Sequence, residues 1–186
     1  MTLQVYYTLE VRDRRGKLLR RIRRRSRSYV IAFLDCLNAA CSQSNRSVTD
    51  IGGTSRTVGA AARFALNGAA DDDTRGPVVG TGTTAVAITD SKLVTQIAQG
   101  TGAGQMDHVL TDVGAPSTSG STRRFTVQRV FVNNSGASIT IQECGIYGLE
   151  VATLYNFCVV RDIVSGGLAV ANGGSATLTY TIGVTA

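Results

Sequence analysis

The stretch SATLTYTIGV, residues 175–184, is the clearest strand signal in the chain. Apolar side chains occupy every second position of it, at Ala176, Leu178, Tyr180, Ile182 and Val184. Successive side chains of a β-strand point to opposite faces of a sheet, so this period of two predicts a strand with one buried face and one polar face. Residues 3–11 alternate in the same way, which predicts a second strand of the same kind.

From residue 47 onward the sequence is rich in Thr, Val, Ala, Gly and Ser, as is typical of short strands joined by turns. NNSG at 133–136 and NGG at 172–174 are strong turn signals, because Asn and Gly tolerate a left-handed backbone. Further strands are predicted at residues 57–66, 85–88, 106–113, 122–133, 138–147 and 153–161, with a short helix at 91–99. The pattern indicates a mainly β fold, an antiparallel β-sandwich or jelly-roll-like domain.

Residues 28–41 are predicted to form the one substantial helix, at the N-terminal side of this domain. Tyr29, Phe33, Leu37 and Ala40 recur at three-to-four-residue spacing, and further apolar residues widen the stripe around most of the helix. We therefore expect the helix to be covered, either by the sheet or by a neighbouring chain. It follows an Arg-rich β-hairpin that turns at DRRG, residues 13–16, where Asp and Gly favour a tight turn.

The formal net charge of +6 is concentrated in that hairpin. Ten of the 19 basic residues lie at positions 12–27 beside the single acid Asp13: Arg12, Arg14, Arg15, Lys17, Arg20, Arg21, Arg23, Arg24, Arg25 and Arg27. The rest of the chain holds nine basic and twelve acidic residues and is mildly acidic. A strand with arginines on both faces cannot be packed against a core on both sides, so we expect residues 17–25 at a sheet edge or against a partner.

Three explanations of this Arg cluster remain open. Guanidinium groups form forked hydrogen bonds with carboxylates, which favours docking on an acidic protein surface. The same groups neutralise phosphates, and Tyr6, Tyr7 and Tyr29 could stack on bases, which would indicate nucleic-acid binding. The third explanation is a solvated edge that blocks strand-to-strand aggregation.

A chain of 186 residues is expected to form one compact domain. Within it, residues 1–46 are interpreted as an attachment element of basic hairpin and helix, and residues 47–186 as a β-sandwich body. No apolar segment is long enough for a signal-peptide core or a membrane span, so the sequence predicts a soluble protein made in a cytoplasm. The four cysteines match no metal spacing and are predicted to be reduced and mostly buried, with a disulfide as the alternative: Cys36, Cys41, Cys144 and Cys158.

The residues offer no catalytic constellation. His108 is the only histidine, and its predicted strand face is otherwise apolar, which favours a structural role. The Gly clusters at 80–84 and 100–104 lack the Gly-Lys-Ser/Thr ending of a phosphate-binding loop. Glu143 and Glu150 lack the cleft aromatics of a glycosidase site. We therefore predict no enzyme activity, no cofactor and no metal site.

The densest acidic run is Asp71-Asp72-Asp73. Its consecutive acids lack the alternate spacing and the closing Glu of a calcium-binding EF-hand. We interpret it as a solvated or partner-facing loop.

Three stretches of the later sequence belong together. They are VVGTGTTAV with ITD at residues 78–90, FVNNSG leading to ECGIY at 131–147, and NGG followed by TLTYTI at 172–182. In this order, over roughly residues 78–184, they resemble accessory structural proteins of tailed-bacteriophage virions, of the capsid decoration, neck, tail or tail-fibre type. The resemblance implies a β-sandwich and a structural role, and it carries over no catalytic residue, because its motifs are turns and strands.

We therefore expect a non-enzymatic structural protein of a tailed-phage virion, made in the host cytoplasm and assembled by interface burial on the capsid or in the neck or tail. Its partners would be other virion proteins and copies of itself, with no membrane partner. The Arg cluster, the helix residues Tyr29, Phe33 and Leu37, and the loop of Asp71, Asp72 and Asp73 are the candidate docking residues. A tail-tip receptor- or carbohydrate-binding module is the alternative, and a nucleic-acid-binding protein the third hypothesis.

Overall fold

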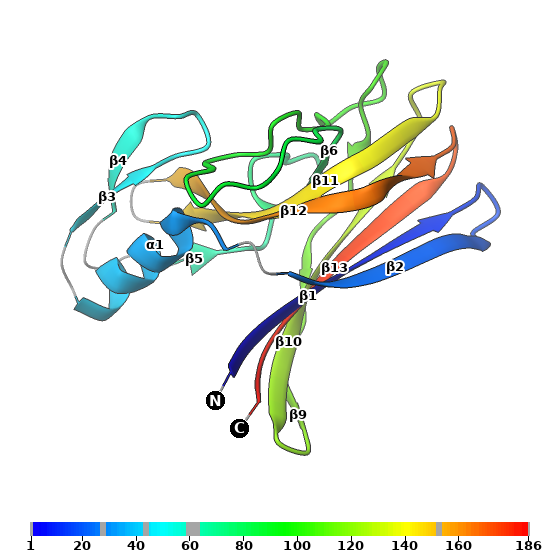
Figure 1. Cartoon of the computed structure of the whole chain (residues 1–186). Helices are drawn as coiled ribbons and strands as arrows, with labels where there is room; N and C mark the ends of the chain where they lie inside the picture. Colours follow the sequence, from blue (N-terminus) through cyan, green and yellow to red (C-terminus); the bar gives the residue numbers. More distant parts are fainter. Residues whose placement is uncertain (1, 27–28, 43–44, 59–63, 152–153, 186) are drawn as a thin grey trace.

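Two antiparallel β-sheets pack face to face in the computed structural model, which describes residues 2–26, 29–42, 45–58, 64–151 and 154–185 (Figure 1). In sheet A the strand order is β2-β1-β13-β10, with three short strands along β10. Its strands are β1 (Thr2–Arg12), β2 (Leu18–Ser26), β7 (Asp107–His108), β8 (Asp112–Val113), β9 (Ser117–Ser119), β10 (Thr122–Val132) and β13 (Ser175–Thr185). The mainly β, sandwich-like fold that the alternation predicted is confirmed.

Sheet B covers one face of sheet A and is built around a long antiparallel pair, β11 (Ile139–Glu150) and β12 (Tyr155–Val170). Two shorter strands, β5 (Phe64–Ala65) and β6 (Gly76–Gly80), pair with β11. The helix α1 (Ile31–Ser42) and a small hairpin of β3 (Arg46–Thr49) and β4 (Ser55–Val58) pack at the end of sheet B (Figure 1). No helix among the described residues is long and apolar enough to cross a membrane.

The strand β13 is the middle of sheet A. It pairs with β1 on one side and β10 on the other along its whole length, from Ser175 to Thr185. Leu178 and Tyr180 are fully buried between the sheets, whereas the alternating Thr177, Thr179 and Thr181 face the other side and stay partly exposed. The two parts into which the sequence divides, 1–46 and 47–186, therefore share one sheet.

A second apolar cluster joins α1 to sheet B. Ala32, Cys36 and Ala39 of α1 are buried against Tyr147 and Phe157, together with residues of β3, β4 and β6. The small side chains of α1, and not its large ones, make this contact. Leu37 of the predicted stripe is 49% exposed, and the side chain of Ala40 lies outside the described part of the structure. The sheet therefore covers only part of the helix, and cover by a neighbouring chain stays a prediction.

Two predictions for residues 81–98 are wrong, because this segment forms neither the strand at 85–88 nor the short helix at 91–99. The N–H groups of Val94 and Thr95 donate to the carboxylate of Glu143 instead of to helix carbonyls. Elsewhere the predicted strand at 57–66 is replaced by β4 and β5, and residues 59–63 lie outside the described ones. The predicted strand at 106–113 is reduced to the two-residue strands β7 and β8.

One strand was not predicted, and another is longer than predicted. The strand β6, GPVVG, was missed because its glycines and proline are weak strand formers, yet it is buried from end to end. The strand β12 continues to Val170 through Gly166 and Gly167, whose φ angles of 78° and 56° suit glycine. The register with β11 shifts here, because residues 164–167 of β12 lie opposite the single residue Gln142 of β11.

Sheet A is longer than sheet B. The ends of β1, β13 and β10 project beyond the sandwich together with β9, and both chain termini lie at this projection (Figure 1). We call this projection the β-arm and define it by residues 2–6, 117–126 and 181–185.

Candidate functional site

The strand β2 forms an edge of sheet A, as predicted for a strand with arginines on both faces. Its register with β1 divides the arginines between the two faces. Arg21, Arg23 and Arg25 lie opposite Glu10, Thr8 and Tyr6, on the side that faces away from sheet B. Alternate residues Arg20, Ile22 and Arg24 lie opposite the buried side chains of Val11, Leu9 and Tyr7.

The arginines on the inner side serve the sandwich itself. Arg20 Nη1 donates a hydrogen bond of 3.2 Å to the carbonyl oxygen of Gly167, which links the edge of sheet A to β12 of sheet B. The charge of Arg24 lies near the hydroxyl of Tyr7, which donates to the carbonyl oxygen of Ile163 at 3.1 Å. Burial raises the pKa of Tyr7 well above its ordinary value, so this hydroxyl stays protonated and keeps donating.

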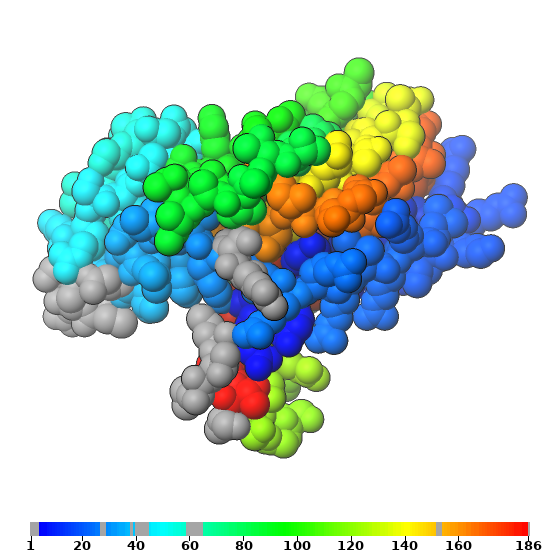
Figure 2. Space-filling model, viewed as in Figure 1, coloured from blue at the N-terminus to red at the C-terminus, as the bar shows by residue number. Residues whose placement is uncertain are grey.

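The basic residues of the turn are held by a local network. The Asp13 carboxylate accepts hydrogen bonds of 2.9 Å from the backbone N–H groups of Arg15 and Lys17, which closes the turn. Arg12 donates to the carbonyl oxygen of Gly16 and pairs with the Glu10 carboxylate, both at 3.1 Å. Arg14, Arg15 and Lys17 are exposed, and Figure 2 shows the hairpin protruding from the body. Arg27 lies outside the described residues.

The outer face of sheet A is open and lined by hydroxyl and guanidinium groups. A shallow hollow of 430 Å³ crosses all four main strands, and its lining residues are Thr8, Glu10, Arg21, Arg23, Arg124, Gln128, Thr177, Thr179 and Thr181. A second hollow of 220 Å³ adjoins it towards the β-arm, lined by Gln4, Tyr6, Arg23, Thr122, Arg124, Thr181 and Gly183. We call this surface the cationic face, after Arg21, Arg23, Arg25 and Arg124.

The charges of the cationic face are only partly neutralised. Arg21 pairs with Glu10 at 3.2 Å, but its side chain remains 59% exposed and it shares that acid with Arg12. The Arg23 guanidinium lies over the Tyr6 ring, 4.7 Å from its centroid, which fixes the position of the charge without cancelling it. The face therefore presents ordered guanidinium groups among threonine hydroxyls, a combination that binds carboxylates or phosphates.

The acidic loop lies elsewhere and is engaged within the chain. Asp71 Oδ1 accepts a 2.7 Å hydrogen bond from the Gln99 side chain, and Asp73 Oδ2 accepts one of 3.0 Å from the Gln99 backbone N–H. Asp72 Oδ1 accepts from both the backbone N–H and the hydroxyl of Thr74. These carboxylates thus hold their own loop and join it to Gln99, and their role in meeting a partner stays a prediction.

The three candidate residues that were predicted on the helix are divided, and Tyr29 precedes α1, which begins at Ile31. Tyr29 forms an isolated bridge with Val160, and its ring stacks on that of Phe33 with centroids 4.5 Å apart. Both aromatic side chains pack partly against the main core, whereas Leu37 points to solvent.

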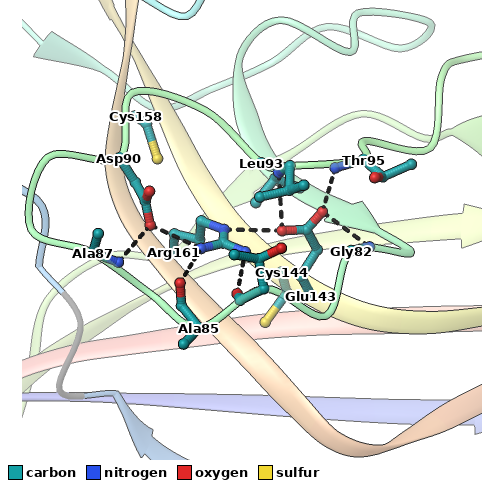
Figure 3. Close-up of polar contacts among 12 residues, drawn as sticks. Gly82, Ala85, Ala87, Asp90, Leu93, Thr95, Glu143, Cys144, Cys158 and Arg161 are labelled. Carbon is teal, nitrogen blue, oxygen red and sulfur yellow. Dashed lines mark hydrogen bonds and ion pairs between the residues drawn. The ribbon is translucent and has the colours of Figure 1, made fainter.

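A buried polar centre, which the sequence did not reveal, connects sheet B to the segment at residues 81–95 (Figure 3). Arg161 Nε donates to Glu143 Oε2 at 2.9 Å, and Arg161 Nη1 contacts Asp90 Oδ2 at 2.8 Å. Arg161 Nη2 also donates to the carbonyl oxygen of Thr84 at 2.8 Å. The side chains of Arg161 and Glu143 are both 0% exposed.

The Glu143 carboxylate accepts three backbone N–H bonds besides the guanidinium. Oε1 accepts from Gly82 at 3.1 Å and from Thr95 at 2.7 Å, and Oε2 accepts from Val94 at 3.1 Å. This centre therefore replaces regular secondary structure over residues 81–95. Its enclosure gives a substrate no access to the carboxylate, so its chemistry is structural. The only signal in the sequence was one charged residue in each of two predicted strands, Glu143 in 138–147 and Arg161 in 153–161.

The histidine and the three cysteines whose side chains the structure describes are also enclosed. Burial lowers the pKa of His108 to about 4, and its ring meets Phe131 edge-on with centroids 5.0 Å apart. Cys36, Cys144 and Cys158 are buried free thiols, as predicted, and burial raises the pKa of Cys36 to about 12. The side chain of Cys41 lies outside the described part of the structure. Within that part, no group of His, Cys, Asp and Glu side chains is arranged to hold a metal ion.

The fold and the site together define a β-sandwich protein with an open cationic sheet face. Comparisons of the chain with protein-family models, with curated proteins and with solved structures each found no match.

Proposed function

We propose that this chain is a non-enzymatic structural protein of a tailed-phage virion, which docks through its cationic face on an acidic surface of a neighbouring virion protein. The observation that carries the proposal is the open sheet face, which presents Arg21, Arg23, Arg25 and Arg124, while Glu10 is the one acid among the residues that line its two hollows. The phage setting, on the capsid or in the neck or tail, rests on the sequence resemblance of residues 78–184.

The form of the face favours a protein partner. It is a broad and shallow surface across four hydrogen-bonded strands, and a stable protein interface needs about 800 Å² per partner. Arginine suits this use because its planar fork pairs with a carboxylate through two hydrogen bonds and is enriched at interfaces. The alternating threonines, such as Thr177 and Thr179, add hydrogen-bonding groups without long flexible side chains that association would have to order.

The other two hypotheses fit the face less well. Sugar binding and base stacking both use open aromatic rings. In the residues that line the two hollows, Tyr6 is the only aromatic, and Arg23 already covers one face of its ring.

A direct test compares particles assembled with the wild-type protein and with the double variant Arg23→Glu/Arg25→Glu, which leaves the β-arm hollow unchanged. We expect the variant to fold, because both arginines are exposed, and to be missing from purified particles. Lys92→Glu is the matched control, since Lys92 is an exposed cation outside the cationic face, and it should be incorporated normally.

The proposal is wrong if particles made without this protein show unchanged composition and stability by electron microscopy. Salt-sensitive retention of the isolated protein on DNA cellulose, lost in the double variant, would instead assign the face to nucleic acid.

A further inference from the structure

The helix α1 leaves an apolar ridge open to solvent. Ile31, Leu34 and Leu37 follow one another at three-residue spacing, and their side chains are 47%, 59% and 49% exposed. The opposite side of α1 is the buried one that packs on sheet B, so these three residues have no role in the core. Exposed aliphatic side chains gathered on one element are typical of an interaction surface.

The β-arm lies apart from α1 (Figure 1), and its residues line an apolar hollow. The hollow has a volume of 230 Å³ and is lined by Pro116, Arg123, Arg124, Phe125, Ile182, Gly183 and Val184. Phe125 pairs in register with Ile182, and Arg123 with Val184, on the side of sheet A that is buried further along the same strands. The hollow is thus a continuation of the inner face of the sheet, beyond the part that the sandwich covers.

The charges beside the two surfaces are opposite. Asp35 lies one helical turn after Ile31 and flanks the ridge. Arg123 lines the hollow and is exposed, with Nη1 donating to the Thr118 hydroxyl at 3.0 Å. Two ridges facing each other would bring Asp35 against its own copy, and two hollows would do the same with Arg123. A ridge facing a hollow brings the acid to the arginine.

We propose that two copies of this chain associate head to tail, with the α1 ridge of one copy seated in the β-arm hollow of the next. A convex row of aliphatic side chains fills a concave apolar surface, and the Asp35–Arg123 contact fixes the orientation. Each copy keeps one ridge and one hollow free, so the contact repeats and produces a ring or an open filament. The hollow shares Arg124 and Gly183 with the end of the cationic face, whereas the ridge and the apolar lining of the hollow lie outside that face. The self-association therefore does not depend on the proposed function.

The test uses two variants that each remove one surface without adding charge. Leu34→Gln/Leu37→Gln changes the ridge, and Val184→Gln changes the hollow. Light scattering over a concentration series should show the wild type growing beyond a monomer, and each variant should associate at least tenfold more weakly. An equimolar mixture of the two variants should recover complexes of two chains, because each supplies the surface that the other lacks, and should grow no further.

Two further measurements separate this geometry from general stickiness. Asp35→Arg and Arg123→Asp should each weaken association, and the chain that carries both changes should regain it. Leu19→Gln is the control, because Leu19 is 56% exposed on β2, near the other end of sheet A from the β-arm, and it should associate as the wild type does. A wild type that stays monomeric over the whole concentration range overturns the proposal, as does a mixture of variants that recovers no complexes.

Discussion

The buried centre of Arg161 and Glu143 gives the sharpest prediction for stability. Replacing Arg161 by Met removes a guanidinium that contacts two carboxylates. Asp90 is 20% exposed and can be rehydrated, but Glu143 is 0% exposed and cannot. Leaving one partner of a buried pair uncompensated costs about 3–5 kcal/mol. Because Glu143 keeps three N–H donors, we expect Arg161→Met to lie at the lower end, about 3 kcal/mol.

The sign of a second substitution tests the reasoning more strictly than the size of the first. In Arg161→Met/Glu143→Gln the buried charge is gone, while one amide oxygen still accepts hydrogen bonds from the backbone. We therefore expect the double variant to be more stable than Arg161→Met alone, although less stable than the wild type.

Urea unfolding measures these free energies, and hydrogen exchange at the amides of Gly82, Val94 and Thr95 reports whether the segment is released locally. Arg21→Met is the matched control, since the exposed Arg21–Glu10 pair should contribute less than about 1 kcal/mol. A double variant less stable than Arg161→Met would refute the account of an uncompensated Glu143 charge.

Three further predictions follow from burial. The pKa of His108 is lowered from 6.5 to about 4, so the unfolded chain takes up this proton first as the pH falls. The free energy of unfolding should therefore fall by about 3 kcal/mol between pH 6.5 and pH 4. Urea unfolding of His108→Leu should lack that part of the loss, and an equal loss in this variant would contradict the prediction. In a Cys41→Ser background, the buried Cys36, Cys144 and Cys158 should react with a thiol reagent only after denaturation, because burial raises their pKa values, and rapid labelling of the native protein would disagree. Gly82→Ala should lower the unfolding free energy by about 1–3 kcal/mol, because a Cβ at this position would collide with Glu143 Oε1. Gly53→Ala is the control: no atom lies near its Cβ position, so it should show only the backbone cost of its φ of 80°.

Several of the strands predicted correctly have a pattern that depends on one buried face. The strands at 122–133 and 175–184 alternate because one side packs against sheet B, and the local sequence records that fact. The edge position of β2 was predictable for a related reason, since its arginines exclude it from the interior.

What could not be predicted depends on residues far apart in the sequence. The segment at 81–95 takes its shape from Arg161 and Glu143, and no local pattern indicates those bonds. The division of the arginines between the two faces of sheet A depends on the register of β2 with β1, which shifts between Val11 and Arg12. The adjacent Leu18 and Leu19 hide that register in the sequence.

The position of β13 in the middle of sheet A sets the order in which the protein can be completed. The strands β11 and β12 and the segment at 81–95 are all made before β13, so sheet B can form while the chain is still growing. The hairpin of β1 and β2 must wait for residues 175–185, because β13 is the strand that joins it to β10. Long-range pairing of this kind slows folding. The cationic face and the β-arm both include β13, so neither surface exists on an unfinished chain, and nascent copies cannot associate through them before synthesis has passed this strand.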